Sequence, residues 1–288
     1  MPEGHVVHSQ AKALKRAFAG KACSVDSPQG RFAEGAALLD GLTVTGTQAF
    51  GKHLFIAFDS GRSIHVHLGL FGKWRIAKGE APAERGLIRL RLQNATHHAE
   101  LRGPTACEVL TEEECRIAVS KIGPDPIRTD ADPLLAWEKV TRSRVAIGAL
   151  LMDQRLFAGV GNIYRAEVLF RHGISPFRPG VQVSWADFDA IWTDLTVLMA
   201  DGVKRRRIDT VRPEHLPEIM GREARRDRHG GEVYVYRRAG LPCYLCDDVV
   251  QVTDMQARNL FWCPTCQPSS PPTHLIQYPV QMAGIPVT

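Results

Sequence analysis

A proline- and glycine-rich segment, 121-KIGPDPIRTDADP-133, separates two parts of the sequence that have different hydrophobic periods. Its four proline or glycine residues and several acids interrupt any regular element, so we place a domain boundary there. Before it, runs such as 52–58, 62–71 and 86–94 have the composition of strands, with glycine and asparagine between them. Strands that follow one another without intervening helices predict an antiparallel β-sandwich.

Most of the other segments have a helical pattern. Residues 1–20 are expected to form a short amphipathic helix that Gly20 ends. Beyond the boundary, apolar residues again recur at helical spacing, and the helices expected there cover 134–140, 147–152, 166–170 and 185–199. We therefore expect a multidomain α+β protein in which a β-sandwich is followed by a helical domain.

Four of the seven cysteines form two Cys-x2-Cys pairs with sixteen residues between the pairs, namely Cys243, Cys246, Cys263 and Cys266. Four thiolates at this spacing can surround one tetrahedral Zn²⁺ and leave it no open position, so we expect one structural zinc ion. An iron–sulfur site and a fortuitous spacing are the alternatives. Residues 232–266 are expected to form two two-stranded elements pinned by these cysteines.

The net charge of +5 is concentrated in one stretch of the chain. Between Lys204 and Arg238 there are eleven basic and six acidic residues, so this stretch has the same excess as the whole chain. Such a block suits a polyanion, although a solvated loop is the alternative. No run of apolar residues reaches the length of a membrane span, and the first residues lack the apolar core of a secretory signal, so we expect a cytoplasmic protein.

The amino terminus, Met1-Pro2-Glu3, offers a nucleophile. Because the residue after Met1 is small, we expect Met1 to be removed, which leaves Pro2 as a free secondary amine. An α-amino group has a pKa of about 8, so part of it is unprotonated at neutral pH. Attack of this amine on C1′ of a deoxyribose gives an iminium ion, which acidifies the C2′ proton and permits strand scission. Glu3 can transfer the protons. An ordinary chain start is the alternative.

Three positions in the strand region are candidates for contact with a nucleic acid. Lys52, in 51-GKHLF-55, can hold a phosphate or assist an elimination, with a solvated surface lysine as the alternative. Leu70 and Phe71 are expected at a loop tip, where apolar side chains can wedge into a base stack and fill the gap left by an extruded nucleotide. Packing of both residues onto the core is the alternative.

Two positions in the second half of the chain are candidate phosphate ligands. The turn 157-FAGVGN-162 would leave backbone N–H groups and the Asn162 side chain at a helix N-terminus, which is a natural phosphate site. Arg258, between the cysteine pairs, can clamp a phosphate with its fork of donors. A ligand-free packing turn and an ordinary surface arginine are the respective alternatives.

In this order along the chain, Pro2-Glu3, Gly51-Lys52-His53, Gly161-Asn162 and the cysteine ribbon with Arg258 strongly resemble the formamidopyrimidine-DNA glycosylase and endonuclease VIII family. The resemblance implies a β-sandwich, a helix–two-turns–helix domain and a zinc finger, with DNA held between the halves. It covers residues 1–267, and the expected units are 1–122 for the catalytic sandwich, 123–231 for the helical domain, 232–267 for the finger and 268–288 for a proline-rich tail outside the family pattern.

The resemblance also implies roles for individual residues. Pro2 matches the nucleophile, Glu3 the proton-transfer acid, and Lys52 the lysine of phosphate contact and δ-elimination. Asn162 and Arg258 match the pair that grips the phosphate at the lesion, with Arg258 counted among the catalytic residues. Leu70 and Phe71 resemble the void-filling residues of the endonuclease VIII branch.

The sequence departs from the family pattern at two places near these residues. Gly69 stands where the endonuclease VIII branch has a glutamine, and His5-Val6 stands where many members have Pro-Glu. The start Pro-Glu-Gly-His is nevertheless similar to one bacterial sub-branch of endonuclease VIII.

We therefore expect a bifunctional DNA glycosylase and abasic-site lyase of base excision repair that acts on oxidised pyrimidines by β,δ-elimination. Its partner would be damaged DNA, double- or single-stranded, and the protein would be a nucleoid-associated bacterial monomer that contacts no membrane. The alternatives are the same chemistry on oxidised purines and a catalytically silent zinc-finger DNA-binding protein.

Overall fold

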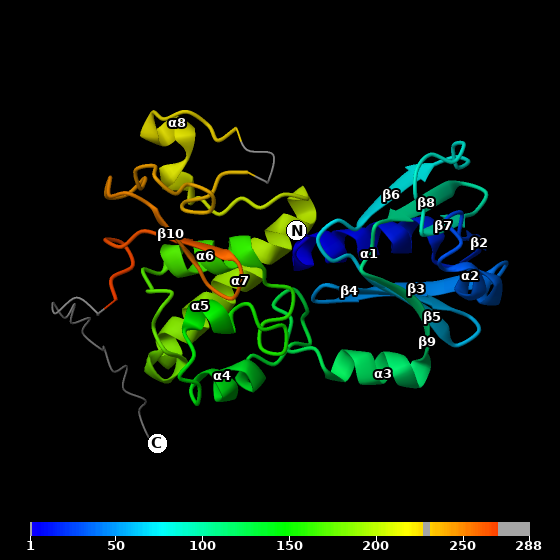
Figure 1. The fold of residues 1–288 in the computed structure, drawn as a ribbon, viewed down its shortest axis with the longest axis horizontal. Coiled ribbons are helices and arrows are strands. Elements are labelled where there is room, and N and C mark those ends of the chain that lie inside the picture. The colour runs from blue at the N-terminus through cyan, green and yellow to red at the C-terminus, as the bar shows by residue number, and fades with distance from the viewer. Residues whose placement is uncertain (1, 227–230, 270–288) are drawn as a thin grey trace, which may run out of the picture.

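The computed structural model describes residues 2–226 and 231–269, and Figure 1 shows its strand-rich and helical halves side by side. Met1 and nearly all of the proline-rich tail lie outside the described residues. The first helix, α1 (Gly4–Phe18), begins directly after Glu3. Its apolar face, which includes Val7, Leu14 and Phe18, is buried in the core of the strand-rich half.

Two antiparallel sheets form the strand-rich half, as expected for a β-sandwich. One has the order β1 (Lys21–Ala22), β3 (Thr43–Phe50), β4 (His53–Phe58), β5 (Arg62–His67) and β9 (Ala106–Thr111). The other has the order β2 (Ser24–Asp26), β7 (Leu90–Gln93), β8 (His97–Arg102) and β6 (Lys73–Lys78). Leu54, Ile64, Leu90 and Leu101 are fully buried in the one core that both sheets share. Strand β6 lies at an edge of its sheet.

Two helices in this half were not predicted. Helix α2 (Ala33–Leu39) is short and lies between strands. Helix α3 (Glu112–Ser120) follows β9 and begins with a capping box, because the Thr111 side chain accepts from Glu114 N–H and Glu114 bonds back to Thr111 N–H. The Thr-x-x-Glu spacing of this cap is visible in the sequence.

The helical half consists of α4 (Leu134–Val140), α5 (Ile147–Leu150), α6 (Asn162–Arg171), α7 (Trp185–Arg205), α8 (Pro217–Met220) and the short 3-10 helices Gly180–Gln182 and Pro213–His215. The predicted helix 134–140 is confirmed to the residue. The predicted helix 166–170 is longer, because α6 begins at Asn162, directly after the glycine turn. Helix α7 also runs past the predicted end and stops at Arg206, which has a left-handed backbone with φ 59°.

The cysteine region contains one two-stranded sheet rather than two. Strands β10 (Gln251–Asp254) and β11 (Asn259–Trp262) pair antiparallel. The first cysteine pair instead lies in a tight turn that an isolated bridge between Pro242 and Val249 closes. Asp247 in this turn has φ 60°, which a strand cannot accommodate.

No helix among residues 2–226 and 231–269 is both long and apolar enough to cross a membrane.

Candidate active site between the two halves

The two halves meet where α1 begins, on the turn that precedes α6. The N–H of Gly4 donates to the carbonyl of Gly159 at 2.8 Å. A Cβ atom on Gly4 would lie 2.7 Å from Gly159 Cα, and Gly159 itself has φ 85°. The backbones therefore approach as closely as they do because both positions are glycine.

Glu3 extends across this contact and is almost fully buried. Its Oε1 accepts from the N–H of Ile163 at 2.8 Å, and its Oε2 accepts from the N–H groups of Gly161 at 3.1 Å and Tyr164 at 3.4 Å. The first N–H groups of α6 are thus satisfied by a carboxylate from the other half of the molecule. The sequence-based interpretation of this helix N-terminus as a phosphate site is wrong for these N–H groups, because Glu3 occupies them.

Burial raises the pKa of Glu3, although the nearby Lys52 and the three backbone N–H groups oppose this. A carboxyl with a raised pKa retains its proton closer to neutral pH and is suited to donate it. Glu3 is the neighbour of Pro2, which is partly exposed, so this acid lies directly beside the candidate nucleophile.

Lys52 lies on the same side of the contact. Its Nζ donates to the carbonyl of Val160 at 2.7 Å. Burial lowers the pKa of Lys52 to about 8, with a further lowering from Arg258 and an opposing effect of Glu3. Near neutral pH this amine can therefore both carry a charge and exchange a proton.

Asn162 and Arg258 come together through the finger. The Asn162 Nδ2 donates to the carbonyl of Asn259 at 2.8 Å, and Asn259 follows Arg258 in the chain. Arg258 is exposed at the end of the β10–β11 hairpin. Arg165, fully buried on α6, donates to Asn162 Oδ1 and so fixes the amide orientation.

Leu70 and Phe71 are 59% and 84% exposed, so they lie at the surface rather than in the core. Gly69 before them has φ 63°, and a Cβ atom there would lie 1.8 Å from Thr105 Oγ1. The glycine at the first departure from the family pattern therefore suits this loop, because a glutamine at position 69 would be strained by this backbone angle and would displace the Thr105 side chain.

The second departure also has a structural explanation. His5 is buried and packs edge-on against Tyr164, with ring centroids 5.5 Å apart. Burial lowers the pKa of His5 to about 4, so the ring is neutral at physiological pH. A Cβ on Gly202 of α7 would lie 3.2 Å from His5 Cβ, which shows how tightly α1 and α7 pack there.

Sequence reasoning missed three residues that hold this site together. Asp125 Oδ2 accepts from Gly51 N–H at 2.7 Å and pairs with His8 Nε2 at 2.7 Å, which fixes the loop that carries Lys52. Gln154 donates to Val160 O and accepts from Gly159 N–H, both at 3.0 Å. Arg165 is the third. Of these, only Asp125 had a visible signal, because it lies in the Gly-Pro-Asp-Pro break of the sequence.

The four sulfur atoms of Cys243, Cys246, Cys263 and Cys266 lie within 4.8 Å of one another, with the closest pairs 3.4 Å apart. A tetrahedral Zn²⁺ with Zn–S bonds of about 2.3 Å requires sulfur separations of about 3.8 Å, so this donor set fits a metal ion. In the described part of the chain, no other group of three or more His, Cys, Asp or Glu side chains is arranged to hold a metal.

The basic block 204–238 is only partly available to a polyanion. Arg238 is buried with its guanidinium 3.4 Å from the centroid of the Tyr244 ring, and Arg222 stacks at 3.8 Å from the same ring. Arg222 also pairs with Glu232 at 2.8 Å. These arginines stabilise the segment that connects α7 to the finger, so the interpretation of the whole block as a phosphate surface is wrong for them.

Comparison with known proteins agrees with this architecture. The model of the formamidopyrimidine-DNA glycosylase N-terminal domain matches residues 1–105, and that of its H2TH domain matches residues 122–212. The protein named endonuclease 8 1 of Mycobacterium tuberculosis is 47% identical over 274 residues, which are 93% of this chain and all of that protein. The DNA-(apurinic or apyrimidinic site) lyase Nei2 of Mycolicibacterium smegmatis is 32% identical over 94% of this chain and all of its own length.

Among solved structures, Lactococcus lactis formamidopyrimidine-DNA glycosylase bound non-covalently to DNA containing an abasic site shares the fold, with a TM-score of 0.75 and 24% identity over 92% of this chain and 99% of that one. The chain therefore belongs to the formamidopyrimidine-DNA glycosylase and endonuclease VIII family of bifunctional DNA glycosylases and abasic-site lyases.

Proposed function

We propose that this protein removes oxidised pyrimidines from DNA and nicks the strand, with the amine of Pro2 as its nucleophile. The observation that carries the proposal is a buried acid, Glu3, next to Pro2 in the chain, together with a half-buried lysine of lowered pKa, Lys52, whose charge acts on that of Glu3. The proposal requires that Met1 be removed, so that Pro2 is a secondary amine.

The proline nitrogen attacks C1′ of the damaged nucleotide, and the bond from C1′ to the base breaks, so that the base leaves with the electron pair and takes up the proton that the attacking amine gives up. Glu3 donates a proton to the sugar oxygen as the ring opens, and the nitrogen lone pair forms the iminium bond to C1′. The iminium ion withdraws electrons, so a C2′ proton is lost and the 3′ phosphate leaves in the β-elimination. Lys52 contacts phosphate and, as a neutral amine, accepts the C4′ proton in the second, δ-elimination, in which the 5′ phosphate leaves.

The remaining residues position the DNA. Asn162 bonds to the residue that follows Arg258, and the Arg258 side chain is exposed, so the two residues can grip one phosphate from two sides. Leu70 and Phe71 fill the space that the extruded nucleotide leaves in the stack. One zinc ion held by Cys243, Cys246, Cys263 and Cys266 would supply only rigidity, because four thiolates leave no ligand position for chemistry.

The relatives named endonuclease 8 support the pyrimidine preference over the same chemistry on oxidised purines. Burial raises the pKa of Glu3 and lowers that of Lys52. Such shifts favour an enzyme over a silent DNA-binding protein, which would gain nothing from them. We propose damaged DNA, double- or single-stranded, as the partner of a monomer, and a cytoplasmic, nucleoid-associated place of action is supported by the bacterial origin of the relatives.

Borohydride trapping tests the proposal. The protein is incubated with oligonucleotides that carry an oxidised pyrimidine, an oxidised purine or an abasic site, and the reduced covalent complex is measured. We expect trapping by the wild type, weakened or abolished trapping by Pro2→Gly, and a mass for the trapped peptide that starts at Pro2. Trapping that Pro2→Gly leaves unchanged, or full activity of protein that retains Met1, contradicts the mechanism.

A further inference from the structure

A long groove separates one face of α1 from the edge strand β6. It has a volume of about 850 Å³ and is lined by α1 from Val6 to Ala17, by β6 from Trp74 to Lys78, and by His97 and Arg206. Val6 lies one helical turn from Glu3, and the eleven-residue step to Ala17 spans about 16 Å at 1.5 Å per residue. The groove thus starts near the active site and runs away from it along the sandwich.

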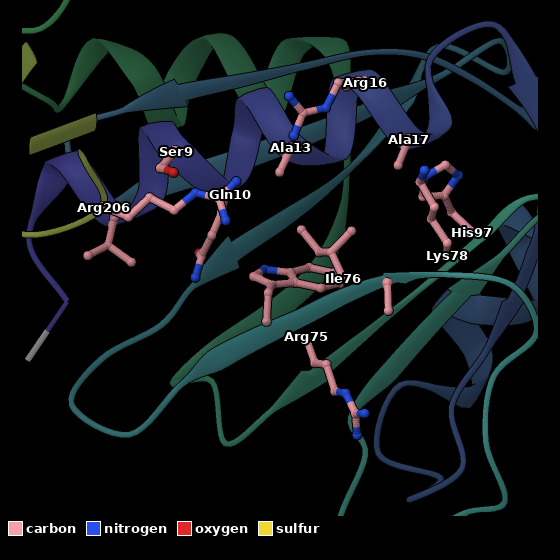
Figure 2. A pocket seen from close by; sticks show the side chains of 13 residues that line it. Ser9, Gln10, Ala13, Arg16, Ala17, Arg75, Ile76, Lys78, His97 and Arg206 are labelled. Carbon is pink, nitrogen blue, oxygen red and sulfur yellow. The ribbon is translucent and has the colours of Figure 1, made fainter. Parts of the chain in front are cut away.

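The two ends of the groove are formed by different parts of the fold. Figure 2 shows Ser9, Gln10 and Arg206 at one end, and Ala17, Lys78 and His97 at the other. Arg206 ends α7, so the helical half contributes this cation to a groove that otherwise belongs to the sandwich.

The groove is positively charged and unneutralised. Arg16, Arg75, Lys78 and Arg206 line it, no aspartate or glutamate does, and none of the four forms an ion pair within the described part of the chain. The pKa of His97 is lowered by desolvation and by the nearby Lys21, Lys78 and Arg16, which reflects the same local excess of charge. Such a concentration of unpaired cations attracts an anion.

The walls of the groove also contain polar atoms that lack a partner. Gln10 Oε1, an acceptor, and Trp74 Nε1, a donor, are buried without a hydrogen bond in the described structure. Buried polar atoms are usually satisfied, so a pair of them in the walls of one groove points to a ligand toward which the side chains of Gln10 and Trp74 turn. Trp74 and Ile76 add apolar surface to the same wall.

These features of the groove fit a ligand that has a flat group with donors and acceptors at its edge and is joined to an anion. A nucleotide has both parts. We propose that the groove between α1 and β6 is a second nucleotide-binding site, in which Trp74 and Gln10 contact the base while Arg16, Lys78 or Arg206 contacts the phosphate. The nucleotide is either one unit of a DNA strand or a free nucleotide. This inference does not depend on the chemistry proposed for Pro2.

Titration calorimetry of the full chain with thymidine monophosphate tests the proposal, with thymidine, inorganic phosphate and a thymidine pentanucleotide as companion probes. We expect Gln10→Leu, and one of Arg16→Ala, Lys78→Ala and Arg206→Ala, to weaken binding of thymidine monophosphate by about tenfold, because its single phosphate lies at one place in the groove and has one of these cations as its partner. Lys73→Ala is the matched control, because Lys73 is an exposed lysine of the same strand that does not line the groove, and it should leave the affinity unchanged.

The probes distinguish the source of the nucleotide. Tighter binding of the pentanucleotide with the same variant pattern identifies a unit of a DNA strand, whereas equal or tighter binding of the monophosphate identifies a free nucleotide. Unimpaired nicking of abasic sites shows that each variant is folded.

Three results overturn the proposal. The first is nucleotide binding that Lys78→Ala, Arg206→Ala and Gln10→Leu leave unchanged, or no binding at all. The second is equal affinity for phosphate and thymidine monophosphate, which would mean that the groove holds an anion only. The third is occupation of the groove by a glutamate-rich peptide in preference to nucleotides, which would identify the free edge of β6 as a peptide site.

Discussion

The carboxylate of Glu3 lies directly against the backbone of Gly161. The N–H of Gly161 donates to Glu3 Oε2 at 3.1 Å, and a Cβ atom on Gly161 would lie 2.3 Å from Glu3 Cδ. The two residues are far apart in the sequence. The Glu3 carboxyl fits there because Gly161 has no side chain.

The first prediction follows from that contact. Gly161→Ala should displace the Glu3 carboxyl and reduce base excision by about 100-fold, because a shift of about 1 Å in a catalytic group costs that much. Single-turnover excision on a duplex with an oxidised pyrimidine measures the effect. Gly46→Ala is the control, since a Cβ there meets no atom within 4 Å. Equal excision by both variants would show that the position of Glu3 is not critical.

The second prediction concerns the protonation of Glu3. Because its pKa is raised by burial, the protonated donor persists to a higher pH than in an ordinary glutamate and is lost as the pH rises through the raised value. The excision rate should therefore have a falling limb at high pH, in addition to the rising limb that deprotonation of the Pro2 amine gives, whereas Glu3→Gln should excise slowly and without the falling limb. DNA affinity, measured by fluorescence anisotropy, should survive the substitution. A wild-type excision rate with no falling limb at high pH would exclude Glu3 as the acid.

The third prediction concerns stability. The pKa of Lys52 is about 8 in the folded protein against an ordinary 10.5, so below pH 8 the charged amine is buried at a cost of at most about 3 kcal/mol. Lys52→Met should raise the Tm at pH 7, and the gain should diminish as the pH rises from 8 to 10.5 and vanish above that, where the amine is neutral in both states. Calorimetry measures this, with the exposed Lys73→Met as control. A Tm that Lys52→Met lowers equally at both pH values would contradict it.

The fourth prediction concerns the exposed loop. Phe71→Ala should slow excision from duplex DNA by about tenfold and leave single-stranded substrates nearly unaffected, because only a duplex contains a stack with a gap to fill. The control is Leu87→Ala, which removes a similarly exposed apolar side chain at 70% exposure. Equal slowing on both substrates would indicate a general loss of binding instead.

The fifth prediction concerns the metal. Elemental analysis should find one zinc per chain, and Cys246→Ser should lose the metal together with most of the DNA affinity, because Arg258 is positioned by the finger. Cys115→Ser removes a cysteine outside the cluster and should change neither quantity. A zinc-free wild-type protein with full activity would refute the assignment.

Local patterns in the sequence predicted most of the fold. The spacing of the cysteines predicted their cluster, and the apolar period predicted the helix at 134–140 to the residue. The long-range contacts were not predictable in this way. Nothing near Glu3 indicates that its carboxylate caps α6, and nothing near Asp125 indicates that it holds Gly51 and His8, because these partners are set by how the halves dock.

The hydrogen bonds that join the two halves also hold the reactive groups of the site in place. Gly4 and Lys52 donate to the carbonyls of Gly159 and Val160, and Glu3 is oriented by the same turn. If the sandwich separated from the helical half, Glu3 and Lys52 would lose these hydrogen bonds at the same time. While it searches intact DNA in such an opened state, the molecule would be chemically harmless, and closure around a lesion would restore its reactivity.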